Sequence, residues 1–154
     1  MKALYILMTL VFISCSSQKE VKNLPFLTDE VYFQKWIGGQ RLTGSGTDFY
    51  IRFKEPFSAN FKIKKLYFHG RELEVIKRND SVFTASYSQR PNVDEELNET
   101  DGQIETPKVV KSKFELKNNE AILEFEQDSK TQFFRITNIK EKELLAYPSA
   151  KPRN

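Results

Sequence analysis

The stretch TDFYIRFK, residues 47–54, decides the fold class of this chain. Its apolar side chains, Phe49, Ile51 and Phe53, alternate with polar ones. A period of two places them on the same face of an extended strand. We therefore expect a β-strand that buries these three side chains and turns the residues between them outward.

Other strand-like runs lie on both sides of this stretch. They are residues 31–37, 61–69, 71–78, 81–88, 111–117, 121–127, 130–139 and 143–147. Turn-prone residues separate the runs about every 8–12 positions, and no stretch sustains a helical period. The pattern predicts an all-β fold, a single antiparallel β-sandwich or a small β-barrel of about eight or nine strands.

Three local features predict details of strand pairing. The apolar parity changes within residues 61–69, which predicts a β-bulge near residues 64–65. Asn-Asp at 79–80 and Asn-Asn at 118–119 each lie between two alternating runs. Two turn-prone residues in that position predict a tight hairpin, so we expect one at each place.

The N-terminal segment MKALYILMTLVFISCSS, residues 1–17, has the layout of a bacterial export signal. Lys2 precedes an apolar run that is shorter than the roughly 20 residues of a transmembrane helix. The run ends in VFISC, which resembles a lipobox although Phe12 stands where Leu is commoner. Cys15 is the only cysteine. We predict that residues 1–14 are a signal peptide and that Cys15 is lipidated, which anchors the protein to a membrane without a spanning segment.

The rest of the chain divides by composition. Residues 15–30 are polar and are interpreted as the lipidated cysteine and a flexible tether, residues 31–150 as the β-domain and residues 151–154 as a C-terminal tail. The tripeptide at 18–20, QKE, resembles the short charged signal that sends some lipoproteins to the cell surface. An ordinary soluble linker is the alternative.

Charge is distributed unevenly along a chain whose total charge is small. The formal net charge is +3, and it becomes +2 without residues 1–14 because Lys2 is the only charge removed. This balance gives no reason to expect nucleic acid as a partner. Residues 90–107 are acidic, whereas residues 50–78 are basic. We interpret 90–107 as a solvated acidic loop, and the alternative is a flap that covers a basic face and opens for an anionic partner.

Four of the six glycines lie in residues 38–46, GGQRLTGSG. Gly39 and Gly44 have the spacing of a P-loop, but Ser45 stands where a P-loop requires lysine. Ser45 does not stand in a G-x-S-x-G motif either. We interpret the segment as a flexible inter-strand loop. The alternative is a ligand-contact loop that includes Arg41, Ser45 and Asp48.

The remaining chemical signals are isolated residues. Trp36 and Tyr50 are candidates for an aromatic platform under a sugar or another flat ligand, although strand aromatics more often belong to a core. His69, the only histidine, is interpreted as a turn residue. The acidic loop fails the EF-hand pattern because Glu99 occupies the glycine position, and a different calcium site there stays open. We predict no catalytic residue, metal site or cofactor.

Several segments resemble a group of small uncharacterised lipoproteins of Bacteroidetes, especially flavobacteria. They are WIGG (36–39), GSGTDFYIRF (44–53), LYFHGREL (66–73), ITNIKEK (136–142) and AYPSA (146–150). The resemblance implies a Gram-negative envelope and an outer-membrane address. It carries no activity and no functional residue.

These observations favour a non-enzymatic, lipid-anchored β-domain that binds an envelope protein or glycan or stabilises an envelope assembly. The membrane itself is a partner through Cys15. The alternative is an envelope hydrolase that acts on glycan or peptide with acidic residues that the sequence does not identify.

Overall fold

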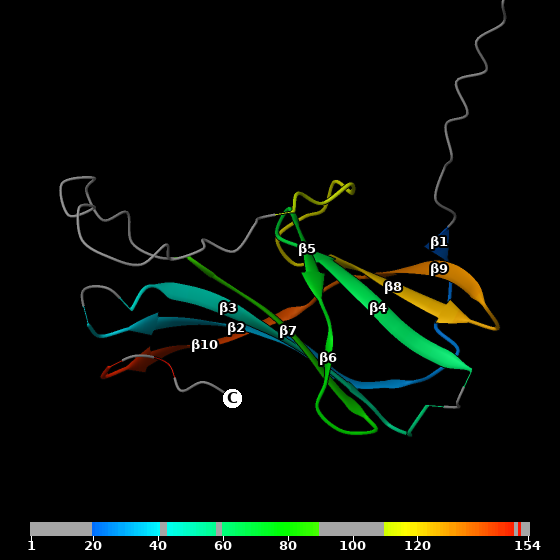
Figure 1. The fold of residues 1–154 in the computed structure, drawn as a ribbon, viewed down its shortest axis with the longest axis horizontal. Helices are drawn as coiled ribbons and strands as arrows, with labels where there is room; N and C mark the ends of the chain where they lie inside the picture. Colours follow the sequence, from blue (N-terminus) through cyan, green and yellow to red (C-terminus); the bar gives the residue numbers. More distant parts are fainter. Residues whose placement is uncertain (1–19, 41–42, 58–59, 90–109, 150, 152–154) are drawn as a thin grey trace, which may run out of the picture.

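The computed structural model describes residues 20–40, 43–57, 60–89, 110–149 and 151, and within them the chain forms ten β-strands and no helix. The strands make two five-stranded sheets that face each other (Figure 1). Sheet A has the order β1-β9-β8-β4-β5, and sheet B has the order β10-β2-β3-β7-β6. The two sheets do not join into one closed sheet, so the all-β sandwich is confirmed over the small barrel.

Both sheets end in a strand taken from a chain terminus. Sheet A contains β1 (Glu20–Val21), β9 (Lys130–Ile136), β8 (Ala121–Gln127), β4 (Phe61–Phe68) and β5 (Arg71–Glu74). Sheet B contains β10 (Lys140–Tyr147), β2 (Thr28–Gly38), β3 (Ser45–Phe53), β7 (Val82–Gln89) and β6 (Ile76–Lys77). Neighbouring strands pair antiparallel except that β1 runs parallel to β9 and β10 runs parallel to β2. The alternation of side chains does not reveal this, because it is the same in parallel and antiparallel strands.

The core lies between the inner faces of the two sheets. Phe49, Ile51 and Phe53 of β3 are each at most 2% exposed, which confirms the face predicted for this strand. Burying one such side chain stabilises a fold by about 1.5–3 kcal/mol. The other buried members of the cluster are Phe33, Phe61, Ile63, Leu66, Phe68, Leu73, Phe83, Ala85, Ala121, Leu123, Phe125, Ile136 and Ile139.

Two-residue turns close two hairpins of sheet A. His69 and Gly70 join β4 to β5 with φ angles of 48° and 72°. Asp128 and Ser129 join β8 to β9 with φ angles of 49° and 60°. Two consecutive positive φ angles are the geometry of a type I′ turn, whose twist matches that of the flanking strands.

The bulge and one of the two predicted hairpins are confirmed. The register between β4 and β8 shifts between Ile63 and Lys65. Residues 79–80 lie in the turn between β6 and β7, where the Asn79 carboxamide oxygen accepts the backbone N–H groups of Ser81 and Val82 at 3.0 and 2.8 Å. An Asn side chain that caps its own turn in this way makes the hairpin locally stable.

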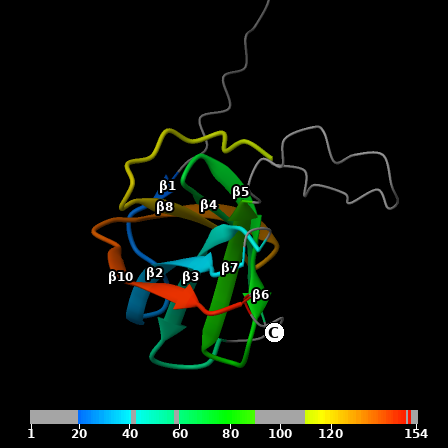
Figure 2. The same cartoon turned by 90° about the vertical axis from the view of Figure 1, so that its left-hand side faces the viewer.

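The hairpin predicted at residues 118–119 is wrong. The chain does turn there, with the Glu120 N–H donating to the Lys117 carbonyl at 3.0 Å. However, β8 already has β4 on one side and β9 on the other, so residues 111–117 have no free edge of β8 to pair with. Residues 110–119 instead cross the outer face of sheet A (yellow in Figure 2), where Phe114 and Leu116 pack on a second small cluster.

The folded domain begins earlier than residue 31. β1 pairs with β9, and Val21, Leu24 and Phe26 pack against the core. The tether predicted over residues 15–30 is therefore corrected for residues 20–30, because three of their side chains pack on the sandwich and β2 already begins at Thr28. The predicted signal peptide, Cys15 and the acidic loop lie outside the described residues. In the described part of the chain, no helix is long and apolar enough to cross a membrane.

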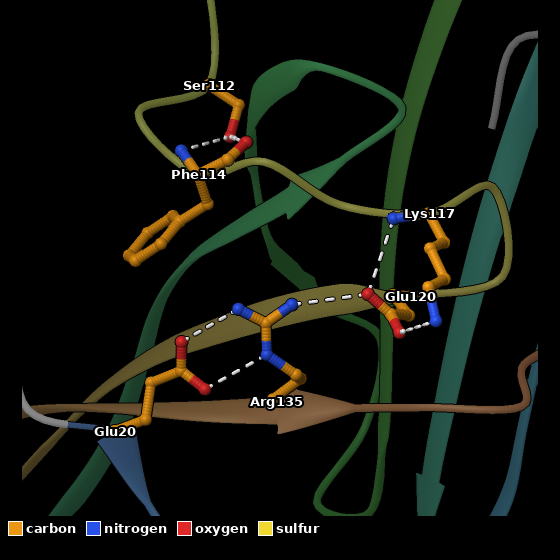
Figure 3. A network of polar contacts seen from close by, with 6 residues as sticks. All are labelled: Glu20, Ser112, Phe114, Lys117, Glu120 and Arg135. Atoms are coloured by element: carbon orange, nitrogen blue, oxygen red, sulfur yellow. Dashed lines mark hydrogen bonds and ion pairs between the residues drawn. The ribbon is translucent and has the colours of Figure 1, made fainter.

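A charged network holds β1 on sheet A (Figure 3). Arg135 of β9 donates from Nε and Nη2 to the two carboxylate oxygens of Glu20, at 3.0 and 2.9 Å. Its Nη1 donates to Glu120 at 3.2 Å, and the same Glu120 oxygen accepts the Lys117 N–H at 3.3 Å. We call these contacts the N-terminal clamp, since they fix the point where the chain enters the domain.

Candidate functional site

The two outer faces of the sandwich differ. Residues 110–119 cross the outer face of sheet A (Figure 2). Tyr67, Ile122 and Phe133 of this face are buried, with Phe114 and Leu116 packed against them. Sheet B carries no comparable cover among the described residues, and only the C-terminal end of the chain returns to its outer face through Lys151. The outer face of sheet B is therefore the candidate site.

Strand register brings three of the predicted site residues to this face. Trp36 of β2 lies opposite Gly46 of β3, and Asp48 and Tyr50 follow Gly46 at intervals of two residues, so all three side chains point outward. Ser45 has the opposite parity on β3 and does not join them. Arg41 lies outside the described residues.

Trp36 is packed into the face and is not an open stacking surface. Only 7% of it is exposed, and its ring lies on Gly46, where an added Cβ would be 2.5 Å from Cζ2 of the indole. Lys151 Nζ lies 5.1 Å from the ring centroid, and Tyr147 meets the ring edge-on. Among the described residues, the indole Nε1 has no hydrogen-bond partner. Gly46 lies within β3 and is needed for this close approach, whereas Gly44 precedes β3 and has a φ of 72°, a conformation that favours glycine.

Asp48 forms a buried ion pair at the same end of the face. It is 6% exposed, and Lys151 Nζ donates to its Oδ1 at 2.6 Å and also contacts Oδ2. A buried carboxylate requires such a partner, because losing its hydration is costly. Lys151 therefore belongs to the folded domain, and the C-terminal tail predicted over residues 151–154 is corrected at this residue.

Tyr50 is stacked on a second tyrosine that the sequence interpretation did not single out. Tyr32 of β2 is its register partner, and the two rings lie 4.7 Å apart and 16° from parallel. Lys142 Nζ lies 3.4 Å from the Tyr32 ring centroid and 2.9 Å from Glu30. Both faces of the Tyr32 ring are therefore occupied, by Tyr50 on one side and Lys142 on the other. Tyr32 shares the parity of Trp36 on β2, and this is the signal that would have identified it.

The electrostatics of this face keep the phenol group of Tyr50 protonated. Burial raises the pKa of Tyr50 above its usual value, and the nearby Asp48 carboxylate raises it further. The Tyr50 hydroxyl is therefore a hydrogen-bond donor at neutral pH. Arg52, Arg78 and Lys140 stand exposed around the pair, and Arg78 Nε donates to Thr84 Oγ1 at 2.9 Å.

His69 is held in its turn by both ring nitrogens. Nε2 donates to the Asn118 carbonyl at 3.0 Å, because a carbonyl only accepts, and Nδ1 then accepts the Tyr87 hydroxyl at 2.8 Å. Burial lowers the pKa of His69, which favours this neutral form. The histidine thus connects sheet A to sheet B through Tyr87 of β7, as a structural turn residue does. Among the described residues, no group of three or more His, Cys, Asp or Glu side chains is placed to hold a metal ion.

A cavity of about 450 Å³ opens between β5 and β7. Its charged lining residues are Lys65, Arg71, Glu72 and Glu74, two of each sign, and Lys65 is paired with Glu72. The Arg71 guanidinium lies 4.5 Å from the Tyr87 ring. This balanced lining gives the cavity no evident charge preference, unlike the outer face of sheet B.

No protein-family model, curated protein or solved structure matches this chain. The candidate site is thus defined by its geometry: a stacked Tyr32–Tyr50 pair with a cation on one ring, exposed basic side chains around it, and a packed Trp36 beside the Asp48–Lys151 ion pair.

Proposed function

We propose that this protein is a non-enzymatic, lipid-anchored module of the cell envelope that binds an envelope polymer through the outer face of sheet B. The observation that carries the proposal is the contrast between the two outer faces. Residues 110–119 bury the apolar side chains on sheet A, whereas sheet B presents ordered aromatic and charged side chains without a covering layer in the described chain. An exposed face built from stacked rings and charges is typical of a recognition surface.

The polar groups of this face suit binding better than catalysis. Asp48 is neutralised by Lys151, and Glu30 by Lys142, so neither carboxylate is poised as a free acid or base. The Tyr50 hydroxyl is a donor whose pKa is raised by burial and by the nearby Asp48 carboxylate. Such groups orient and hold a ligand, and in the described part of the chain no carboxylate or histidine is hydrogen-bonded to the Tyr32 or Tyr50 hydroxyl as an activating base.

The proposed membrane attachment places this module close to the lipid surface. Five residue steps separate Cys15 from Glu20, where the N-terminal clamp begins. An extended chain covers at most about 3.3–3.6 Å per residue, so lipidation at Cys15 keeps β1 within roughly 18 Å of the anchor. We place this anchor in the outer membrane, in keeping with the resemblance to flavobacterial lipoproteins.

Co-sedimentation of the full chain with purified envelope polymers tests the proposal. The full chain in detergent is mixed with insoluble peptidoglycan, with capsular polysaccharide coupled to beads and with immobilised outer-membrane proteins. We expect retention by one polymer class. Tyr32→Ala combined with Tyr50→Ala removes the stacked pair and is expected to reduce retention by roughly 5- to 150-fold, the loss of two contacts of roughly 0.5–1.5 kcal/mol each.

Two controls make the result specific to this face. Tyr32→Phe combined with Tyr50→Phe keeps the stacked rings and removes only the hydroxyl groups, so it separates ring packing from hydrogen bonding. Lys113→Ala changes the covered face of sheet A and is expected to leave retention unchanged. Retention that survives the double alanine variant, or that is lost equally in Lys113→Ala, contradicts the proposal.

A further inference from the structure

The side chains around Tyr32 and Tyr50 give the outer face of sheet B a positive charge. Four cations surround the pair, and we call them the cationic collar: Arg52, Arg78, Lys140 and Lys142. Glu30 lies among them, close to Arg52, Lys140 and Lys142, and the Asp48 carboxylate beside Tyr50 is neutralised by Lys151. This part of the face thus has an excess of three positive charges, while the whole mature chain is expected to carry only +2.

Strand register explains how the collar forms. Lys140 is the register partner of Tyr32 on β10, and Arg52 follows Tyr50 by two positions on β3. Arg78 extends from the end of β6 and is held by Thr84 of β7. The cations therefore lie on both sides of the tyrosine pair, across the width of the sheet. The four strand spacings from β10 to β6 amount to roughly 19 Å, which is wide enough for a ligand with several charged groups.

Part of the collar is free to bind. Lys142 is paired with Glu30 at 2.9 Å, and Arg78 uses its Nε on Thr84. Arg52 and Lys140 are exposed, and no ion pair joins either of them to another described residue. Guanidinium and ammonium groups bind carboxylate, sulfate and phosphate through charge-assisted hydrogen bonds, and the tyrosine hydroxyls add neutral donors beside them.

We infer that the outer face of sheet B binds an acidic glycan, a polysaccharide that carries repeated carboxylate, sulfate or phosphate groups. This inference rests on the proposed function and names its ligand class. A neutral glycan fits less well, because stacking on sugar needs an open ring face. Both faces of Tyr32 are covered, and Trp36 is packed between Gly46 and Lys151. The available groups are hydrogen-bond donors and positive charges, which select anions.

The experiment compares an acidic and a neutral polysaccharide on the same protein. Binding of the detergent-solubilised full chain to polygalacturonate and to dextran is measured by affinity electrophoresis at low salt. The test variant is Arg52→Gln combined with Lys140→Gln, which leaves the tyrosine stack and its Lys142 contact in place. The matched control is Lys62→Gln combined with Lys130→Gln, two exposed lysines of sheet A that remove the same total charge.

We expect polygalacturonate to bind at least about tenfold more tightly than dextran, and the binding to weaken about tenfold in the test variant and less than twofold in the control. Raising the salt to about 0.5 M is expected to screen most of this preference. Equal binding of polygalacturonate and dextran, both lost in the double tyrosine-to-alanine variant, overturns the acidic preference but leaves the proposed function intact. Retention by no envelope polymer overturns both.

Vesicles of phosphatidylglycerol distinguish a glycan from an anionic membrane surface. The vesicles are added to full chain whose Cys15 is replaced by serine, so that no lipid anchor contributes to binding. An acidic-glycan site predicts weak vesicle binding that differs little between the test variant and the control. Strong vesicle binding that the test variant alone abolishes, together with no polygalacturonate binding, would show that the collar contacts lipid headgroups and would refute the inference.

Discussion

Replacing Arg135 with methionine tests how the N-terminal clamp holds the first strand. Methionine keeps most of the apolar stem of arginine and removes the guanidinium that makes two bonds to Glu20 and one to Glu120. The side chains of Arg135 and Glu20 are each 33% exposed. Solvent screening therefore makes these bonds weaker than those of a fully buried ion pair. Their bidentate geometry makes them stronger than those of an ordinary surface ion pair. We estimate a loss of about 1–2 kcal/mol in the attachment of β1.

This loss has a specific local consequence. β1 has only two residues and lies at the edge of sheet A, so it opens without unfolding the sandwich. A loss of about 1–2 kcal/mol raises the population of the open form by roughly 5–30-fold. Trypsin cuts after Lys22 only when this segment leaves the sheet. We expect the initial cleavage after Lys22 in the full chain to accelerate by the same factor, while the domain beyond β2 stays resistant.

A second ion pair of similar exposure provides the control. Lys64 and Glu126 lie 2.9 Å apart in sheet A, with side chains 35% and 36% exposed. This pair stays intact when β1 opens, so Lys64→Met is expected to leave cleavage after Lys22 unchanged even if global stability falls slightly. A rate of cleavage after Lys22 in Arg135→Met within twofold of the wild-type rate, or an equal acceleration in both variants, would refute this role of the N-terminal clamp.

Three further predictions concern single sites. Gly46→Ala places a Cβ 2.5 Å from the Trp36 ring. We therefore expect the free energy of unfolding in urea to fall by about 1–3 kcal/mol and the fluorescence emission of the single tryptophan to shift. Gly70→Ala, with open space around its Cβ, should leave the emission unchanged. Because burial lowers the pKa of His69, the stabilisation by the neutral imidazole is present above about pH 6.5 and declines as the pH falls. His69→Asn, in which asparagine tolerates the positive φ, should therefore lose less stability than wild type between pH 7 and 5. Equal losses of stability would contradict this. Cys15→Ser is expected to abolish acylation and release the protein from membrane fractions, and normal labelling with radioactive palmitate in this variant would rule out lipidation at Cys15.

The strand faces were predictable because burial on one side of a sheet leaves a local trace in the sequence. The spacing of Phe49, Ile51 and Phe53 by two residues predicted their common buried face. The parity change within residues 61–69 predicted the bulge in the same way. Which strands pair with each other in a sheet leaves no such trace in the sequence. Residues 111–117 alternate because they lie against sheet A, and alternation is the same whether a segment packs on a sheet or pairs within it.

The candidate site was predictable only in part, for the same reason. Trp36, Asp48 and Tyr50 could be predicted because they lie on two strands that are adjacent in the sequence and in the sheet. Lys142 and Lys151 reach the same face from the other end of the chain, through the parallel pairing of β10 with β2 and the return of the C-terminal end. No spacing rule connects residues this distant, so their contribution emerged only from the structure.

The placement of the terminal strands sets the order in which this protein is completed during its synthesis. Tyr32 of β2 pairs with Lys140, 108 positions later, so sheet B has an open edge at β2 until β10 has been made. Ribosomes add about 5–20 residues per second, which leaves that edge open for roughly 5–20 s in every new chain. An unpaired strand edge is a template for other chains. Slow synthesis therefore prolongs the exposure of this edge to other chains, and any truncation before residue 140 leaves the β2 edge permanently unpaired.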